Sequence, residues 1–248
     1  LSLPGASLLG IDLSPRQVQM AREFADAVGL SNVRFEALGI TEVDDSLGEF
    51  DYIVCHGVYS WVPADVQDAI LRVASRLLAP RGIAYVSYNS YPGWHMRGMV
   101  RDLLVFHDDP MLPLSVRASR GREVVEFMAQ AAPQSSELYS RILNEELGTL
   151  RVAHDSYFLH EVLESVNEPL YFTEFMRRAK RHRLRYLGDS DPAAWKVIPP
   201  AVEQQLQGWA RDEIHFQQYL DFVRNRTFRR TLLCHEEVEL ASEPKSEG

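Results

Sequence analysis

Cysteine is scarce in this chain, with only Cys55 and Cys234 among the 248 residues. Two cysteines exclude a disulfide-rich scaffold and suit a reducing compartment such as the cytosol. No apolar run approaches the roughly 20 residues that a membrane-spanning helix needs. We therefore expect a cytoplasmic protein with no membrane span and no signal peptide.

Basic residues are also in the minority. Lys and Arg together number 26 and Asp and Glu 35, which gives a formal net charge of −9. This acidic balance argues against a broad nucleic-acid-binding surface. Apolar residues make up 46% of the chain and charged residues 25%, which argues against a disordered protein.

Metal ligands are not grouped in the sequence. His154, His160, His182 and His215 are scattered, and Cys234-His235 has no second cysteine nearby. Because structural and catalytic zinc sites need three or four ligands at characteristic spacing, we predict no metal site.

Strand and helix patterns alternate over the first 90 residues. Residues 8–12 form a short apolar run, which is typical of a parallel strand covered on both faces. Ser14 and Pro15 then supply an N-cap and a first helical residue. The further patterns are strands at 33–38, 50–56 and 82–88 and a helix at 63–78. This alternation predicts βαβ units and a mostly parallel sheet.

The strongest chemical signal in this part is Asp12, which closes the first predicted strand. Ligands of open α/β sheets bind outside the carboxyl ends of the strands, and two carboxylate oxygens match the two hydroxyls of a ribose. The alternative is an aspartate that only caps the next helix. Because Ser14 already supplies a cap, the ribose role is favoured. Nicotinamide dinucleotides and S-adenosylmethionine (SAM) both carry such a ribose.

The motifs that follow resemble those of one cofactor class. Asn32-Val33-Arg34-Phe35-Glu36, Phe50-Asp51-Tyr52-Ile53-Val54 and the Leu77-Leu78-Ala79-Pro80-Arg81-Gly82 turn resemble successive motifs of class I SAM-dependent methyltransferases. Four further stretches resemble bacterial methyltransferases that carry a methyltransferase regulatory domain: 55–63, 85–98, 167–172 and 228–235. Protein lysine methyltransferases of outer-membrane proteins look like relatives.

The resemblance implies an α/β fold, with a Rossmann-like, mostly parallel methyltransferase sheet and a large helical insertion. No Gly-x-Gly-x-Gly occurs in the 248 residues. We therefore expect the first strand and the glycine-rich loop upstream of Leu1, and we expect SAM binding and activity to require them. The family's sheet needs two more strands after residues 83–88, the last of them antiparallel, and 184–188 and 228–234 are the candidates.

This expectation divides the chain into four parts. Residues 1–95 form the core, and residues 96–168 form a helical insertion or lid. Residues 169–240 return to the core sheet with its last two strands and a further helix, and match the regulatory-domain region. Residues 241–248 form a polar tail. Helices are predicted at 96–107, 119–132, 137–150, 157–166, 171–183 and 200–224.

The resemblance implies SAM as the cofactor, with a binding set around the predicted strand ends. Many class I enzymes place an acid after the second visible strand to meet the adenine amino group, and Gly39 stands at that place. Adenine is then held by apolar contacts and backbone groups. The predicted cofactor-binding residues are Asp12, Leu13, Gly39, Ile40 and Cys55.

His56 ends the third visible strand, where the reacting methyl group is expected. It is our candidate catalytic residue, as a base or as a group that orients the nucleophile. The alternative is a hydrogen-bonded, structural histidine. Both alternatives stay open, because positioning alone supplies much of the rate of a methyl transfer.

Aromatic and amide side chains follow the two strand ends and form the predicted substrate-binding set. An aromatic rim attracts a lysine or another amine through cation–π interactions of about 0.5–2 kcal/mol per contact. The alternative for the aromatic side chains is that they pack the loops, which we favour for Trp61, and the alternative for Asn89 is a tight turn into the next helix. The set consists of Tyr59, Asn89, Tyr91 and Trp94.

The sequence thus predicts a SAM-dependent methyltransferase whose acceptor, a protein or a small molecule, is unknown. A protein lysine or another amine is the favoured class. The alternative is a non-catalytic regulatory or interaction module of a larger methyltransferase, and a third hypothesis is a nicotinamide-dependent oxidoreductase. The basic run from Arg177 to Arg185 is interpreted as a solvated or ion-paired face. Nothing in the sequence fixes the oligomeric state.

Overall fold

The structure is a computed structural model that describes residues 5–132, 136–155, 158–191 and 198–240. The predicted polar tail 241–248 lies outside the described residues. The chain divides into two compact units. Unit 1 comprises Leu1–Val86, Met176–Ser190 and Thr231–Gly248, and unit 2 comprises Ser87–Phe175 and Asp191–Arg230.

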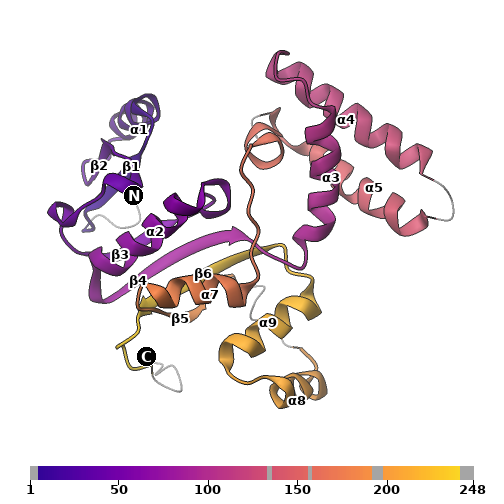
Figure 1. Ribbon diagram of the computed structural model, residues 1–248. Helices are drawn as coiled ribbons and strands as arrows, with labels where there is room; N and C mark the ends of the chain where they lie inside the picture. Colours follow the sequence, from indigo (N-terminus) through magenta and orange to yellow (C-terminus); the bar gives the residue numbers. More distant parts are fainter. Residues whose placement is uncertain (1–4, 133–135, 156–157, 192–197, 241–248) are drawn as a thin grey trace. The chain divides into compact units, whose positions relative to one another are not determined.

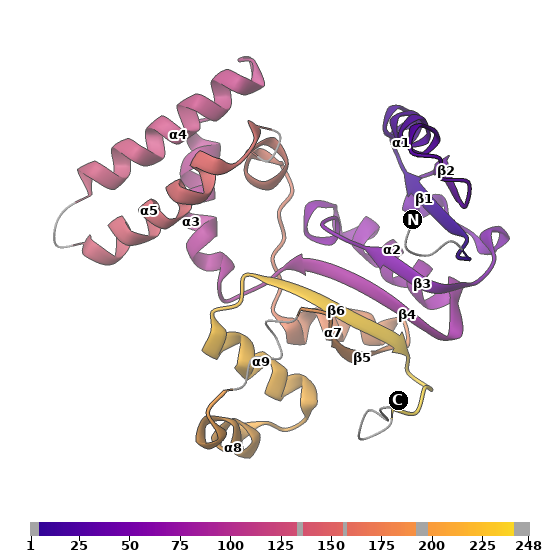
Figure 2. The same cartoon turned by 180° about the vertical axis from the view of Figure 1, so that it is seen from behind.

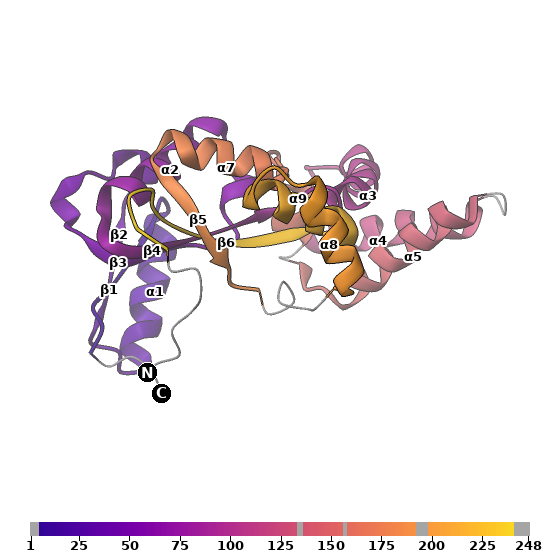
Figure 3. The ribbon, with the colours of Figure 1, turned by 90° about the horizontal axis from the view of Figure 1, so that it is seen from below.

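Unit 1 begins with a strand–helix–strand motif. Strand β1 (Leu8–Asp12), helix α1 (Pro15–Ala27) and strand β2 (Val33–Ala37) follow one another, and Figure 3 shows α1 beside the two strands. β1 and β2 are parallel, in register from Leu8 opposite Val33 to Asp12 opposite Ala37. The Ser14 side chain accepts a hydrogen bond from the Gln17 N–H, which confirms the prediction that Ser14 is the N-cap.

A second sheet is formed by four strands in the order β3-β4-β6-β5 (Figure 2). The strands are β3 (Phe50–Cys55), β4 (Leu78–Asn89), β5 (Leu184–Asp189) and β6 (Phe228–His235). β3 and β4 are parallel, whereas β5 and β6 are antiparallel. The chain therefore returns to the sheet after a long helical stretch, and the predicted α/β fold class is confirmed.

β1 and β3 each have an edge with which no other described strand pairs. Among the described residues β1 pairs only with β2, and β3 pairs only with β4 and not with β1. The expectation that residues 8–12 are covered on both faces is wrong for this structure, because every residue of β1 is at least partly exposed. Tyr52 and Val54 of β3 are exposed as well, although parallel strands are normally buried.

Helix α2 (Ala64–Leu77) packs the core of unit 1. Its apolar residues recur at helical spacing and are buried, as the periodicity predicts. Val73 and Leu77 form a cluster with Val43, and this cluster contacts Ile11 of β1 and Ile53 of β3. The two sheets of unit 1 thus share one apolar core, although their strands do not pair.

Unit 2 is helical (Figure 1). Its helices are α3 (Trp94–His107), α4 (Leu114–Ala131), α5 (Glu137–Val152), a π-helical turn (Phe158–Leu163), α8 (Pro200–Trp209) and α9 (Glu213–Arg224). Helix α7 (Phe172–Arg181) carries the chain from unit 2 into unit 1. No helix within the described ranges is long and apolar enough to cross a bilayer.

The prediction of one continuous helix over 200–224 is wrong. The chain breaks between Trp209 and Glu213 and starts a new helix there. Asp212 is the N-cap of this helix, and its side chain accepts a hydrogen bond from the His215 N–H at 2.7 Å. An aspartate at this place stabilises a helix start more than a helix interior, so it favours two helices over one.

Helices α3, α4 and α5 and the π-helical turn enclose the core of unit 2. This core consists of Val100, Leu104, Ala118, Val125, Ala129, Leu143, Leu147, Leu150, Phe158 and Val162. Gly121 of α4 faces the core directly, because a Cβ atom there would lie 2.3 Å from Cζ of Phe158 and 3.2 Å from Leu104. A Cβ atom on Gly148 of α5, in contrast, would have no neighbour within 4 Å.

This difference predicts opposite effects for two glycine-to-alanine substitutions. Gly148→Ala should stabilise the protein by about 0.5–1 kcal/mol, because alanine has the higher helix propensity. Gly121→Ala should destabilise it by about 1–3 kcal/mol, because the buried Phe158 ring has no room to move. Denaturant unfolding measures both, and equal effects of the two substitutions would contradict the packing described here.

Candidate active site

The carboxyl ends of β1 and β2 bring together three of the predicted cofactor-binding residues, Asp12, Leu13 and Gly39. Asp12 pairs with Ala37, and the Leu38 N–H donates to the Asp12 carbonyl at 3.0 Å. Leu13 therefore lies next to Gly39, where a Cβ atom would stand 3.3 Å from Cδ1 of Leu13. The parallel register itself creates this group.

The Asp12 carboxylate is exposed, and one of its oxygens has a local partner. Oδ1 accepts a hydrogen bond from the Ser14 N–H at 2.8 Å. Asp12 therefore bonds to the backbone just before α1, as the capping alternative requires in part. Its exposed carboxylate nevertheless stays accessible to a ligand. Leu13 follows with 78% of its surface exposed, so an apolar side chain lies beside the charged one.

The structure adds Glu42 to this group, which sequence reasoning missed. Glu42 Oε2 accepts a hydrogen bond from the Gly39 N–H at 3.1 Å. The carboxylate is brought there by the short 3₁₀ helix from Ile40 to Glu42. A glutamate three residues after the start of a helix often accepts a hydrogen bond from the backbone N–H of the first capping residue, and this spacing could have indicated the contact. Ile40, in contrast, packs against the apolar core of unit 1.

His56 lies immediately after β3 and is paired with a tyrosine of β4. Its Nδ1 lies 2.8 Å from the Tyr85 hydroxyl, and its side chain is exposed. Tyr85 lies opposite Val54 in the parallel register, which brings the two rings to a centroid distance of 5.8 Å. An exposed histidine is suited to proton transfer, while the hydrogen bond with Tyr85 also fits a structural role.

Cys55 precedes His56 and pairs with Val86 of β4. Burial raises the pKa of the Cys55 thiol to about 12, against a small opposing effect of a backbone hydrogen bond with Tyr59. The thiol is therefore neutral at physiological pH. It fits an apolar wall of a cofactor site and is unsuited to act as a nucleophile.

Three of the four predicted substrate-binding residues are buried. Tyr59 is 0% exposed and Trp94 3%, and the Arg97 guanidinium lies 5.0 Å above the Trp94 ring. Asn89 is 2% exposed and donates from Nδ2 to Oδ1 of Asn167 at 3.1 Å. These surroundings favour the packing alternative for all three side chains.

Tyr91 is partly exposed and belongs to an aromatic cluster of unit 2. It stacks on His95 at a centroid distance of 4.1 Å and an angle of 16°, and Tyr171 lies 5.3 Å away. The Tyr171 hydroxyl is 3.2 Å from Nε2 of His95. Burial and the neighbouring Tyr171 and Asp102 raise the pKa of Tyr91, so its hydroxyl is protonated at neutral pH.

Tyr171 and His95 are absent from the predicted set. Tyr171 reaches Tyr91 only through a tertiary contact, whereas His95 lies four residues after Tyr91 and was missed although it is near in the sequence. The segment before Tyr171 pairs with the end of β4: the Leu170 N–H donates to the Asn89 carbonyl at 3.0 Å, and the Tyr91 N–H donates to the Leu170 carbonyl at 3.1 Å. The 167–172 motif indicated that this segment belongs to the family pattern. It did not indicate which residues the segment contacts.

The basic run on α7 and β5 is ion-paired at Arg183, and its other described contacts include hydrogen bonds. Arg183 contacts Glu236 and Glu237, and His182 Nε2 lies 2.7 Å from Asp68. Arg178 donates to the buried side chain of Gln67. In the described part of the chain, no group of three or more His, Cys, Asp or Glu could hold a metal ion.

Two protein families match this chain. A family described as "Methyltransferase domain" matches residues 1–135, and one described as "Predicted methyltransferase regulatory domain" matches residues 154–235. The chain belongs to the methyltransferase family. The resemblance found in the sequence is thereby confirmed.

Individual relatives match between 74% and 97% of this chain. The uncharacterized protein RP789 of Rickettsia prowazekii is 41% identical over 96% of this chain and 43% of its own length. The uncharacterized protein RP028 of the same organism is 38% identical over 74% of each chain. The structure of PKMT2 from Rickettsia typhi in complex with AdoHcy has a TM-score of 0.86 at 38% identity, covering 97% of this chain and 46% of that one.

This methyltransferase-family chain thus spans less than half the length of RP789 and PKMT2. In unit 1, Asp12 and Gly39 lie at the carboxyl ends of the parallel strands β1 and β2, and His56 lies at the carboxyl end of β3. Its unit 2 carries the aromatic cluster of Tyr91, His95 and Tyr171.

The environment of Cys55 makes a prediction for chemical labelling. At pH 8 the native protein should react with iodoacetamide at Cys55 about a thousandfold more slowly than an exposed thiol, because so little thiolate is present. Above pH 9 the unfolded chain loses the thiol proton before the folded one does, so this group lowers stability as pH rises. Mass spectrometry of alkylated peptides measures the rate. Labelling of Cys55 as fast as in denatured protein would contradict its burial.

Proposed function

We propose that this chain is part of a SAM-dependent methyltransferase that transfers a methyl group to a lysine or another amine of a protein. The observation that carries the proposal is the group of Asp12, Leu13 and Gly39 at the strand ends of a methyltransferase-family sheet. The relative PKMT2 was solved with AdoHcy, which is SAM without the transferred methyl group. Its name denotes a protein lysine methyltransferase.

The residues present fit the nucleoside part of SAM. The exposed Asp12 carboxylate offers acceptors for the two ribose hydroxyls. The exposed Leu13 side chain offers an apolar surface for adenine, and the missing Cβ of Gly39 leaves that surface accessible. Glu42 is placed to accept a hydrogen bond from an amino group. When bound, SAM supplies an electrophilic methyl group.

The aromatic cluster of unit 2 supports an amine as the acceptor. Tyr91, His95 and Tyr171 present partly exposed rings, and such rings attract an ammonium group or hold a desolvated amine. Because an ammonium group is no nucleophile, a lysine must lose a proton before transfer, and His56 is our candidate for orienting or accepting that proton. Helix α3 itself carries His95, and we assign the helical stretch over residues 96–168, to which α3 belongs, to an acceptor platform.

The location is proposed to be cytoplasmic. Cys55 and Cys234 are both free thiols, as expected in a reducing compartment.

Asp12 tests the cofactor assignment. In the full-length protein Asp12→Ala should weaken SAM binding by about 1–3 kcal/mol, the usual result of leaving hydrogen-bonding groups unpaired. Isothermal titration calorimetry with SAM, and with NAD as a competing hypothesis, measures this. Methyl transfer from labelled SAM to a polylysine peptide should fall in parallel.

Asp44 provides a matched control. Like Asp12, the Asp44 carboxylate accepts a hydrogen bond from the N–H two residues later, here that of Ser46 at 2.9 Å. Its side chain is also exposed and also lies in unit 1. Asp44→Ala should leave SAM affinity unchanged. Equal affinity of the Asp12 and Asp44 variants would remove the ribose role, and binding of NAD instead of SAM would overturn the proposed function.

A substitution of His56 distinguishes a catalytic base from a structural histidine. His56→Asn keeps a hydrogen-bonding group toward Tyr85 but cannot titrate near neutral pH. If His56 acts as a base, the variant should lose about 10²–10⁴-fold in rate, together with the acidic limb of the pH–rate profile. Tyr85→Phe should keep that limb, since the imidazole remains. A His56→Asn enzyme with the wild-type profile would assign His56 a structural role.

A further inference from the structure

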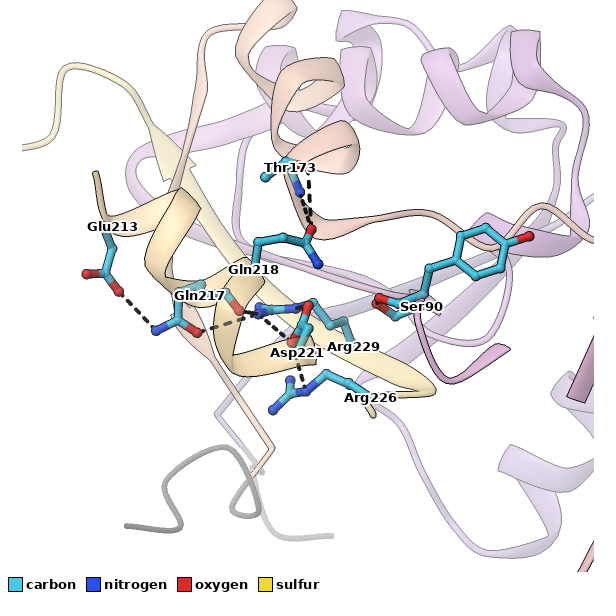
Figure 4. A network of polar contacts seen from close by, with 9 residues as sticks. Ser90, Thr173, Glu213, Gln217, Gln218, Asp221, Arg226 and Arg229 are labelled. Carbon is cyan, nitrogen blue, oxygen red and sulfur yellow. Dashed lines mark hydrogen bonds and ion pairs between the residues drawn. The ribbon is translucent and has the colours of Figure 1, made fainter. Parts of the chain in front are cut away.

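Unit 2 contains a buried cluster of charges that the proposed reaction does not use directly (Figure 4). Asp221 of α9 and Arg229 of β6 are each 1% exposed. Two hydrogen bonds join them: Arg229 Nε to Asp221 Oδ2 at 2.8 Å, and Arg229 Nη2 to Asp221 Oδ1 at 2.9 Å. Such a bidentate pair fixes both the distance and the orientation of its partners.

A second arginine extends the cluster. Arg226 Nε lies 3.3 Å from Oδ1 of Asp221, and the Arg226 N–H donates to the Asp221 carbonyl at 3.1 Å. Asn225 between them has a φ of 47°, the left-handed conformation that ends α9. Asp221 therefore holds the turn from Asn225 to Thr227, which we name the α9–β6 turn, through its side chain and its backbone.

The α9–β6 turn holds the segment that carries Tyr91. The Ser90 N–H donates to the Thr227 carbonyl at 2.8 Å, and the Gly93 N–H donates to the Arg226 carbonyl at 2.9 Å. The contact is so close that a Cβ atom on Gly93 would lie 2.5 Å from the Asn225 carbonyl oxygen. Only glycine allows the two backbones this approach.

The same cluster contacts the segment that carries Tyr171. The guanidinium of Arg229 lies 3.7 Å above the ring of Phe172, the residue next to Tyr171. Helix α9 also binds this segment directly, because Oε1 of Gln218 accepts a hydrogen bond from the Thr173 N–H at 3.1 Å. The two rings of the proposed acceptor site thus sit on two segments, and both are fixed to one buried ion pair.

We propose that Asp221 and Arg229 are positioning residues of the acceptor site, which set the spacing of Tyr91 and Tyr171 by holding their two segments. The proposal rests on the proposed function in that it takes these tyrosines as the acceptor site. A buried ion pair adds little net stability compared with apolar residues of the same volume, because both charges are desolvated. Its fixed bond directions, in contrast, define the geometry of the segments that it joins.

Hydrogen exchange of single amides in the full-length protein tests the proposal. Asp221→Ala should raise the exchange rates of the Ser90 and Gly93 amides about 10- to 100-fold, because their acceptor carbonyls lie in the turn that Asp221 holds. Mass spectrometry with fragmentation to single residues measures these rates. Exchange at Ser90 and Gly93 that stays at the wild-type rate would overturn the proposal.

Asp212→Ala is the matched control. Asp212 caps the same helix and is exposed, so its loss weakens α9 without touching the ion pair. This variant should leave Ser90 and Gly93 at the wild-type rates, and an equal increase in both variants would reduce Asp221 to a general stabilising role. If Asp221→Ala does not fold, Arg226→Met removes only the outer contact and should give a smaller increase at the same two amides.

A kinetic measurement connects this geometry to the reaction. With polylysine as the acceptor, Arg229→Lys should raise KM for polylysine at least about fivefold, since lysine cannot form the bidentate pair. The dissociation constant of SAM should not change. An unchanged KM together with unchanged exchange would refute the positioning role. Absence of any transfer to polylysine by the wild-type enzyme would count against the proposed acceptor, while the exchange experiment still decides whether Asp221 holds the segment.

Discussion

The parallel pairing of β3 with β4 is the constraint that places the candidate catalytic residue His56 and the segment that leads to Tyr91. Cys55 lies opposite Val86 in this register, and Tyr85, one residue earlier, is thereby placed beside His56. The same strand continues to Asn89, after which Tyr91 leaves the sheet. A shift of the register by one residue would turn every side chain of β4 to the opposite face and separate Tyr85 from His56.

The two parts of the candidate active site are built from different interactions. The cofactor group lies at strand ends, where exposed polar and apolar side chains meet a backbone fixed by the parallel register. The proposed acceptor group is held by side chains and backbone together: ring contacts join Tyr91 and Tyr171, a backbone bridge joins Ser90 and Leu170, and the pair of Asp221 and Arg229 is buried beside them. A buried charge pair tolerates few geometries, so it suits a site that must keep two rings at one spacing.

Much of the fold could be predicted from local patterns. The strand–helix–strand unit around Asp12 follows from apolar runs, the Ser14 cap and Gly29, all of which act over a few residues. The return of β5 and β6 to the sheet followed from the topology that the resemblance implied. The break at Asp212 was missed, because the apolar periodicity continues across it while the capping interaction of one side chain ends the helix.

The sequence by itself determined the fold class, the family and the position of Asp12 at a strand end, because these depend on residue patterns along the chain. The tertiary structure decided which candidate side chains remain accessible. It buried Tyr59 and Trp94 and left Tyr91 partly exposed, and it brought Glu42 to Gly39 and Tyr171 to Tyr91. The physical reason is that burial, stacking and ion pairing join residues far apart in the sequence, as Arg229 and Phe172 show, and no local pattern encodes which distant side chain a residue will meet.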